Sequence, residues 1–514
     1  MTSVTRTWIG YVAMCIGMFM AILDIQVVAS SLTNIQHALN IPDDKISWIQ
    51  TAYLMAEVVA IPLTGMLTRA LSLRWMFVAA TGGFTLASIA CALCSSADPL
   101  IALRVVQGFC GGMLIPAVFT SVFTILPKKH EILATAMAGV VAMVAPTVGP
   151  YVGGWLTQTY SWHWIFLINV VPGILVCSVV GFFIPVGTPN IGYLRKIDYA
   201  TVFLAAIFLG TLELLLKEAP PHHWSGLYVY SLFAICAVSG ALALYFCFSK
   251  PNPFIDLRRF TRIGFAVGCS LSFVAGMGLY GSTYILAIFL GGVRAHTPIE
   301  IGEIIMVSGA VQMLAAPAAA LLESRVDGRI LVTFGYAVFG IGLLINGQMT
   351  YQTDFDGLFW PQVLRGVAVM FCILPTTRLA MEGWKIQDAP DASGQFNLMR
   401  NLGGAIGIAL IDTILAQRTP EHAQHIIDRL QAGDAHMAAR VGLPTEYFHG
   451  VPMGPIDPSM RAYVEPFIQR AALTDSFNEA WIVLGALFIV SLIAVAFMRS
   501  GTWQPGHETE AEDA

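Results

Sequence analysis

The chain has 514 residues, of which 56% are apolar and only 11% charged, and its mean hydropathy is +0.70. Because soluble proteins carry about 25% charged residues, this composition excludes an ordinary soluble globular protein. The formal net charge of −5, without a basic tract, gives no indication of a nucleic-acid partner. Nine scattered cysteines are not the pattern of a disulfide framework.

Uncharged stretches long enough to cross a bilayer recur along nearly the whole chain. The first continues past Asp24 without a small-residue cleavage site, so we interpret it as a retained span and not as a signal peptide. We expect an all-α polytopic membrane protein with fourteen transmembrane helices. They fall near 8–31, 46–68, 74–97, 99–126, 131–158, 162–185, 198–217, 225–248, 264–290, 300–322, 330–349, 359–382, 394–417 and 477–498.

Lysine and arginine are distributed unevenly between the loops that join these spans. The short loops on the side opposite to the termini hold only Lys45, Lys217 and Arg294. The side shared by both termini holds Arg69, Arg74, Lys128, Lys129, Arg195, Lys196, Lys250, Arg258, Arg259, Arg262, Arg325, Arg329, Arg378, Lys385 and Arg499. This asymmetry predicts that both termini are cytoplasmic.

An internal similarity indicates two related halves. Residues 104–108 lead to Pro116 on span 4, and residues 364–366 lead to Pro375 on span 12. We therefore expect an N-terminal six-helix bundle (1–190), two inserted helices with their flanking loops (191–262), a C-terminal six-helix bundle (263–500) and an acidic cytoplasmic tail (501–514). The C-terminal bundle includes an outer loop at 418–476, whose amphipathic first part we interpret as a solvated helix and not as a metal site.

Ionisable side chains inside spans usually face a bundle interior or a wet cavity, so they are candidate functional residues. Asp24 on span 1 and Arg104 on span 4 fall at a similar depth, where each can neutralise the other. We interpret them as a protonation switch, because moving Arg104 away would favour proton uptake by Asp24. The alternative is a static structural pair.

Further candidates follow from the same reasoning. Glu57, near the midplane of span 2, is a candidate for proton coupling or for attracting a cationic substrate, and the alternative is a protonated structural residue. Gln107 is expected to line the same cavity. Arg365 and Asp412 form a candidate second pair, unless Asp412 lies near the interface. Two other acids near span ends are expected to be mostly solvated, namely Glu213 and Glu303.

Span 5 contains small residues four apart together with two prolines, within residues 145–154. Small residues let another helix approach closely, and prolines bend a helix. The stretch with Gly149, Pro150, Gly153 and Gly154 is therefore suited to a hinge or a sliding contact.

These residues together resemble the major facilitator superfamily over about residues 8–500, and within it the fourteen-span drug:proton antiporter branch typified by EmrB and QacA. Gly149-Pro150-x-x-Gly153-Gly154 resembles the antiporter motif of span 5. Residues 104–108 resemble the span 4 motif, and this resemblance implicates Arg104 in proton transfer. Residues 23–24 and 162–169 are similar to the motifs of span 1 and of the start of span 6.

The loop between spans 2 and 3 departs from the family pattern G-x-L-x-D-R-x-G-R. Gly65 is retained, but Arg69 stands in place of the acid and Ser72 in place of the second glycine, before Arg74. We therefore do not expect the usual charge relay of this gating loop. After Asp24, the branch pattern has an asparagine and a proline, and here Ala29 and Thr33 stand in their places. These changes indicate a subgroup with a different substrate.

The resemblance implies a proton-coupled antiporter of the bacterial inner membrane that exports lipophilic, often cationic drugs by alternating access, with no metal and no cofactor other than the proton gradient. It also implies a periplasmic membrane-fusion adaptor and an outer-membrane channel as partners. Two alternatives remain: a dedicated exporter of one metabolite, siderophore or lipid, and, more remotely, a membrane-embedded enzyme or receptor.

Overall fold

The computed structural model describes residues 3–185, 187, 189–190, 192, 198–250, 255–323, 325–384, 388–447 and 458–497. Several residues used in the sequence interpretation lie outside these ranges, namely Arg195, Lys196, Lys385, Arg499 and the tail 501–514.

Fourteen helices in the described ranges are long and apolar enough to cross a membrane, which confirms the expected number. They are α1 (Ser3–Ser30), α4 (Trp48–Leu71), α5 (Leu73–Ala92), α6 (Ala97–Ile125), α7 (Glu131–Thr159), α8 and α9 together (Trp164–Leu167 and Val170–Phe183), α10 (Tyr199–Glu218), α11 (Leu227–Ser249), α12 (Ile263–Ile288), α13 (Pro298–Glu323), α14 (Gly328–Asn346), α15 (Phe355–Met381), α16 (Ala389–Gln431) and α18 (Pro458–Val495). Shorter elements join them: α2 (Leu32–Leu39), α3 (Asp43–Ile46), η1 (Lys128–His130), η3 (Leu257–Thr261), η4 (Phe289–Val293), α17 (Ala435–Val441) and η5 (Thr445–Tyr447).

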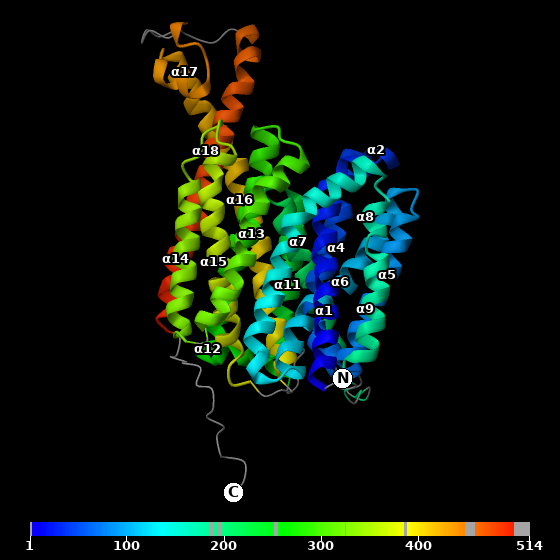
Figure 1. Cartoon of the computed structure of the whole chain (residues 1–514). Coiled ribbons are helices and arrows are strands. Elements are labelled where there is room, and N and C mark those ends of the chain that lie inside the picture. Colours follow the sequence, from blue (N-terminus) through cyan, green and yellow to red (C-terminus); the bar gives the residue numbers. More distant parts are fainter. Residues whose placement is uncertain are drawn as a thin grey trace.

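The long helices stand side by side, with α1 beginning at one end of the array and α16 and α18 projecting beyond the other helices at the other end (Figure 1). We call the end at which α1 begins the terminal face, and the other end the opposite face. The charge pattern predicts that the terminal face is cytoplasmic.

Two apolar cores divide the array into bundles. One core joins residues of α1 and α4–α9, and the other joins mainly residues of α12–α16 and α18. The same glycine contact occurs in each bundle: a Cβ added to Gly108 of α6 would lie 2.2 Å from the carbonyl oxygen of Tyr53 on α4, and one added to Gly366 of α15 would lie 2.5 Å from that of Ser308 on α13. The two contacts are equivalent, as expected for two related halves.

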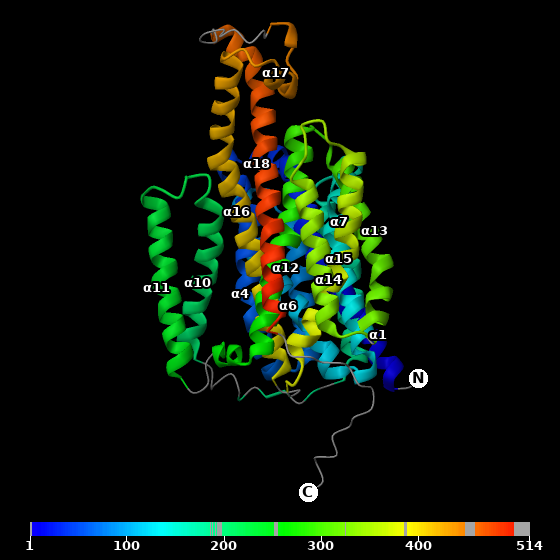
Figure 2. The ribbon, with the colours of Figure 1, turned by 90° about the vertical axis from the view of Figure 1, so that its left-hand side faces the viewer.

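The inserted helices α10 and α11 pack against each other and stand at the edge of the array, beside α4 and α16 (Figure 2). Lys217 near the end of α10 lies over the Trp48 ring of α4, with Nζ 5.7 Å from the ring centroid. Glu213 is only partly exposed and interacts electrostatically with Glu57, so the expectation that Glu213 is mostly solvated is wrong. Glu303 is exposed.

The segment 418–476 is largely helical in its described residues. This agrees with the helix expected in its first part and corrects the interpretation of the rest as a loop. α16 continues without a break to Gln431, and α18 begins at Pro458. The Arg418 guanidinium of α16 donates to both carboxylate oxygens of Glu479 on α18, at 2.7 and 2.9 Å. Above this ion pair the segment has an apolar core of its own, which explains why it extends as ordered helices: Ala423, Ile426, Leu430, Met437, Ala438, Val441, Leu443, Val464, Ile468, Ala471 and Ala472.

Candidate functional site

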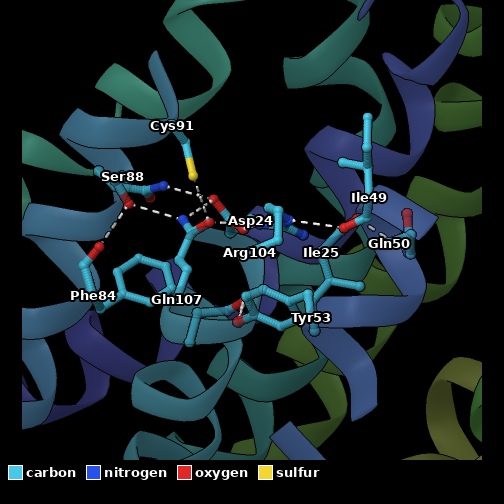
Figure 3. Close-up of polar contacts among 12 residues, drawn as sticks. Asp24, Ile25, Ile49, Gln50, Tyr53, Phe84, Ser88, Cys91, Arg104 and Gln107 are labelled. Carbon is cyan, nitrogen blue, oxygen red and sulfur yellow. Dashed lines mark hydrogen bonds and ion pairs between the residues drawn. The ribbon is translucent and has the colours of Figure 1, made fainter. Parts of the chain in front are cut away.

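The predicted pair of Asp24 and Arg104 is present and fully buried within the first bundle. An Asp24 oxygen accepts a hydrogen bond from the Arg104 guanidinium, and the other oxygen accepts from Gln107 Nε2 at 2.9 Å and Asn169 Nδ2 at 2.8 Å. Figure 3 shows Asp24, Arg104 and Gln107 converging between the helices. Three donors around one carboxylate stabilise its ionised form in a fully buried site.

Other helices fix the position of Arg104. Its Nε donates to the Ile49 carbonyl oxygen at 3.1 Å, and its Cζ lies 4.2 Å from the centroid of the Tyr53 ring, both on α4. Gln107 Oε1 accepts from Arg104 Nη1 at 2.7 Å, while Gln107 Nε2 also donates to Ser88 Oγ on α5 at 2.8 Å. The ion pair therefore connects α1, α4, α5 and α6, so a change in its charge state acts on four helices.

Asn169 is a site residue for which the sequence interpretation gave no role. It lies between α8 and α9, where the sixth span is interrupted, and this break turns its amide toward Asp24. The available signal was an amide that directly follows the apolar run Trp164–Ile168, since a polar group at that place needs a buried partner.

The glycine- and proline-containing motif of span 5, which resembles the antiporter motif, lies against the helix that carries Asp24. A Cβ added to Gly149 of α7 would lie 2.3 Å from Gln26 Cβ, and one added to Gly153 would lie 2.2 Å from Ser30 Oγ and 2.8 Å from the Val27 carbonyl oxygen. The glycines therefore allow α7 to approach the outer part of α1 closely.

The remaining motif residues do not interrupt α7. Pro150 lies inside the helix, which runs from Glu131 to Thr159. Gly154 is buried, and its carbonyl oxygen accepts from Thr157 Oγ1 at 3.1 Å. The motif is thus a tight contact between two helices and not a break in one.

Replacing Gly153 with alanine should separate α1 from α7 and reduce both stability and transport. The added methyl group would meet backbone atoms of α1, which cannot rotate away, so we expect a loss of about 1–3 kcal/mol in the free energy of unfolding. Thermal unfolding of the purified protein measures the loss. Gly181→Ala on α9 is the control, because the nearest atom to its added methyl group is 4.0 Å away; equal melting temperatures for the two variants would contradict the prediction.

Glu57 lies on α4 facing α6, where Gly112 leaves room for it: a Cβ on Gly112 would lie 3.0 Å from Glu57 Cγ. The residue is 5% exposed, and within the described part of the chain its carboxylate has no hydrogen bond and no ion pair. Its electrostatic neighbours are Glu213 of α10 and Arg104. Glu57 is therefore a buried acid without an ion-pair partner among the described side chains.

Two of the three gating-loop residues meet an acid from the other bundle. Arg69 on α4 forms an ion pair with Asp391 on α16 at 2.6 Å, and a Cβ on Gly65 would lie 2.6 Å from Asp391 Oδ1. Asp391 also pairs with Arg259 of η3 at 2.9 Å. We call Arg69, Asp391 and Arg259 the terminal-face cluster. Arg74 lies over the Trp75 ring, at 5.1 Å from its centroid, and within the described part of the chain it forms no ion pair with this cluster.

The terminal-face cluster explains the departure of the loop from the family pattern. The acid that the loop lacks is supplied by Asp391, which the sequence interpretation did not identify because it lies just before the predicted span 394–417. The loop therefore does take part in a charge contact, and this contact joins the two bundles: the loop supplies the arginine and the other bundle supplies the acid.

Arg365 and Asp412 do not form the predicted second pair. Arg365 donates to Gln362 Oε1 at 2.6 Å and to Ser282 Oγ at 2.5 Å, while Asp412 accepts from the Tyr284 hydroxyl at 2.7 Å. Depth along a helix placed them at a comparable level, but their side chains point to different neighbours.

Arg400 on α16 is a buried arginine that the sequence interpretation passed over, although it lies inside a predicted span. Its Cζ lies 5.1 Å from the centroid of the Phe119 ring of α6, so it faces the other bundle. It also borders a small cavity lined by Ser272, Ala275, Cys372, Ile373, Thr376, Thr377 and Phe396.

Comparisons with known proteins agree with this architecture. The sequence profile of the Major Facilitator Superfamily matches residues 14–408. The chain is 35% identical over 495 residues to the Colistin resistance protein EmrB of Acinetobacter baumannii, covering 96% of each chain. It is 26% identical over 491 residues to the Multidrug export protein EmrB of Escherichia coli K12, covering 95% of this chain and 94% of the relative. The structure of the human organic anion transporter MFSD10 shares the fold at a TM-score of 0.57 and 12% identity, covering 95% of this chain and 99% of that one.

Proposed function

Because the chain belongs to the Major Facilitator Superfamily, we propose that it is a proton-coupled antiporter that exports lipophilic, often cationic drugs by alternating access. The observation that carries the proposal is the fully buried Asp24–Arg104 pair, held by Gln107 and Asn169. Relatives named for colistin resistance and multidrug export support drugs as the substrate class.

The proton step follows from the geometry of the pair. While Arg104 lies against Asp24, its positive charge neutralises the carboxylate, which then stays ionised and binds no proton. A movement of α6 relative to α1 that separates them leaves a buried carboxylate without a counter-charge, and such a group takes up a proton. Since the contacts of Arg104 extend to α4 and α5, protonation favours one arrangement of the bundle over another.

Glu57 provides the attraction for a cationic substrate in this proposal. It has no ion-pair partner among the described side chains, and it lies one turn from Tyr53, which packs on Arg104. A cation beside Glu57 and a proton on Asp24 would therefore act on the same helices, and exchange requires only that each stabilises a different state. Gln107 is the polar link between Arg104 and Asp24.

The terminal-face cluster is the proposed gate. Asp391 of the second bundle joins Arg69 of the first to Arg259, so the two bundles are held together at this face. Opening toward the terminal face requires these ion pairs to separate.

The same proposal assigns a location and partners. We place the protein in a bacterial inner membrane with both termini cytoplasmic, as the positive-inside pattern favours. The helical projection of α16, α17 and α18 at the opposite face is then periplasmic, and its separate core suits it as a docking element for a membrane-fusion adaptor that leads to an outer-membrane channel.

Everted membrane vesicles with an imposed inside-acid pH gradient test the function. A panel of lipophilic drugs is added, and collapse of the gradient is followed for the wild type, Asp24→Asn and Glu57→Gln. We expect collapse with several drugs in the wild type and none with Asp24→Asn. With Glu57→Gln, we expect collapse to be lost for cationic drugs and retained for neutral ones.

Protein in each vesicle preparation is checked for folding by its monodisperse elution after extraction. No collapse with any drug from folded wild-type protein would contradict multidrug antiport, and would favour a dedicated exporter of one metabolite, siderophore or lipid. Equal collapse by the wild type and Asp24→Asn would remove Asp24 from the coupling step.

A further inference from the structure

Arg365 is the arginine of the second bundle that corresponds to Arg104, and it is likewise buried, with 5% of the residue exposed. It lies on α15, and its contacts come from within its own bundle. It donates to Gln362 of α15 and Ser282 of α12, and its Cζ lies 5.7 Å from the Trp481 ring of α18 and 5.9 Å from the Phe339 ring of α14.

The two bundles hold their arginines in partly similar ways. In each, a glutamine of the same helix accepts from the guanidinium: Gln107, three residues after Arg104, at 2.7 Å, and Gln362, three residues before Arg365, at 2.6 Å. In each, the first helix of the bundle also supplies an oxygen that accepts from the arginine. The residue that carries this oxygen lies six positions before the end of its helix, at Ser30 in α1 and at Ile288 in α12. That oxygen belongs to an acid, Asp24, in the first bundle and to a neutral serine, Ser282, in the second.

The second bundle therefore contains a buried cation without its acid. Among the described residues, no ion pair involves Arg365, and its side-chain hydrogen bonds go to the neutral Gln362 and Ser282. Asp412, the acid expected beside it, is bound to Tyr284. A buried charge without an ionic partner is unfavourable, so a counter-charge from outside the described chain would stabilise this bundle.

In the part of the chain that the structure describes, buried polar atoms without a hydrogen-bond partner occur in Arg365 itself and on the helices that pack against it. Within the described chain, Arg365 Nε and Trp481 Nε1 are buried without an acceptor. On α14, both the Nδ2 and the Oδ1 of Asn346 are buried without a partner, one turn from Gly342, where an added Cβ would lie 3.3 Å from Arg365 Cγ. Unpartnered buried polar groups of α14, α15 and α18 therefore lie on the helices that contact the Arg365 side chain.

We propose that this part of the second bundle binds a small inorganic anion, with chloride as the occupant, between Arg365, Trp481 and Asn346. A monovalent anion accepts hydrogen bonds from N–H donors and supplies the charge that Asp24 supplies in the first bundle. All the contributing helices belong to one bundle, so the anion stabilises that bundle and is distinct from the proposed proton and drug sites.

Thermal unfolding of the purified full-length protein tests the proposal. The wild type is titrated with potassium chloride against potassium gluconate at constant ionic strength. A ligand that binds only the folded state raises the melting temperature with its concentration, so we expect a saturable rise of several °C in chloride, and a similar rise in bromide. Equal melting in chloride and gluconate would overturn the proposal, and would leave water as the partner of these donors.

Substitution of Ser282 separates a bound anion from a general salt effect. Ser282→Asp places a carboxylate against Arg365, so the variant should melt at the same temperature in chloride and gluconate. Ser282→Asn is the matched neutral control and should keep the chloride dependence. A chloride dependence of full size in Ser282→Asp would contradict the proposal. Should Ser282→Asp fail to fold, Arg365→Gln replaces it, because removal of the charge should also remove the dependence.

Discussion

Replacing Arg104 with methionine is expected to abolish drug-driven proton movement and to lower the free energy of unfolding by about 3–5 kcal/mol. The substitution keeps the apolar stem but leaves Asp24 fully buried, with only the neutral donors Gln107 and Asn169. The carboxylate then has to be buried as an uncompensated charge or remain protonated, and in the second case it cannot exchange its proton. Gradient collapse in everted vesicles and chemical unfolding in detergent measure the two effects.

The double variant Asp24→Asn with Arg104→Met distinguishes a coupled pair from two separate residues. Because neither charge is then left alone, the double variant should recover much of the lost stability while transport remains absent. Additive losses of stability in the double variant would mean that the two side chains do not interact. Gradient collapse that survives in Arg104→Met would exclude Arg104 from the proton step.

The membrane spans could be predicted from the sequence because one physical requirement dominates. A helix that crosses lipid must be apolar over about 20 residues, and this signal is local. The predicted span 198–217 and the observed α10, Tyr199–Glu218, differ by one residue at each end. Where the helices leave the membrane, this requirement no longer applies. The amphipathic first part of 418–476 indicated a helix there, but the sequence did not indicate that α16 runs into it unbroken or that α18 begins as early as Pro458.

Matching of depth predicted one ion pair and failed for another. Asp24 and Arg104 lie at one depth and also face each other, whereas Arg365 and Asp412 lie at comparable depth and face different helices. Depth gives the height of a residue along its helix but not the side on which it lies. Facing is set by how the bundle packs, and close glycine contacts such as that of Gly108 with Tyr53 fix that packing.

The gate was misjudged for a different reason. The motif of the loop between spans 2 and 3 was compared with its family pattern as one continuous stretch of sequence. Because Arg69 stands where the pattern has an acid, the comparison indicated that a charge contact is missing. Its partner Asp391 lies in the other bundle, and a single sequence carries no signal for such a distant pairing. Gly65, one turn from Arg69, was retained because Asp391 occupies the space in which its side chain would lie.

The terminal-face cluster leads to the second large expected effect. Replacing Asp391 with alanine should open the protein toward the terminal face, because it removes the acid that neutralises both Arg69 and Arg259 and leaves two like charges near each other. Ser393→Cys is a suitable reporter, since Ser393 is 2% exposed and its Oγ lies 3.5 Å from the Pro116 carbonyl oxygen of the other bundle. The nine native cysteines are replaced first.

Labelling of this reporter by a membrane-impermeant maleimide in everted vesicles should be about tenfold faster or more in Asp391→Ala, because a loss of about 1.4 kcal/mol from the closed state changes its population ratio tenfold.

Asp388→Ala is the matched control. Asp388 also contacts Arg259, at 3.4 Å, but its side chain is 41% exposed, so the contact is screened by water and its loss should change labelling little. If Asp391→Ala labels as slowly as the wild type, apolar contacts between α4 and α16 keep the terminal face closed, and the charges of the cluster do not. If Asp391→Ala labels faster and Asp388→Ala does not, Asp391 is the acid that keeps the gate closed. It then takes the place of the acid that the loop itself lacks.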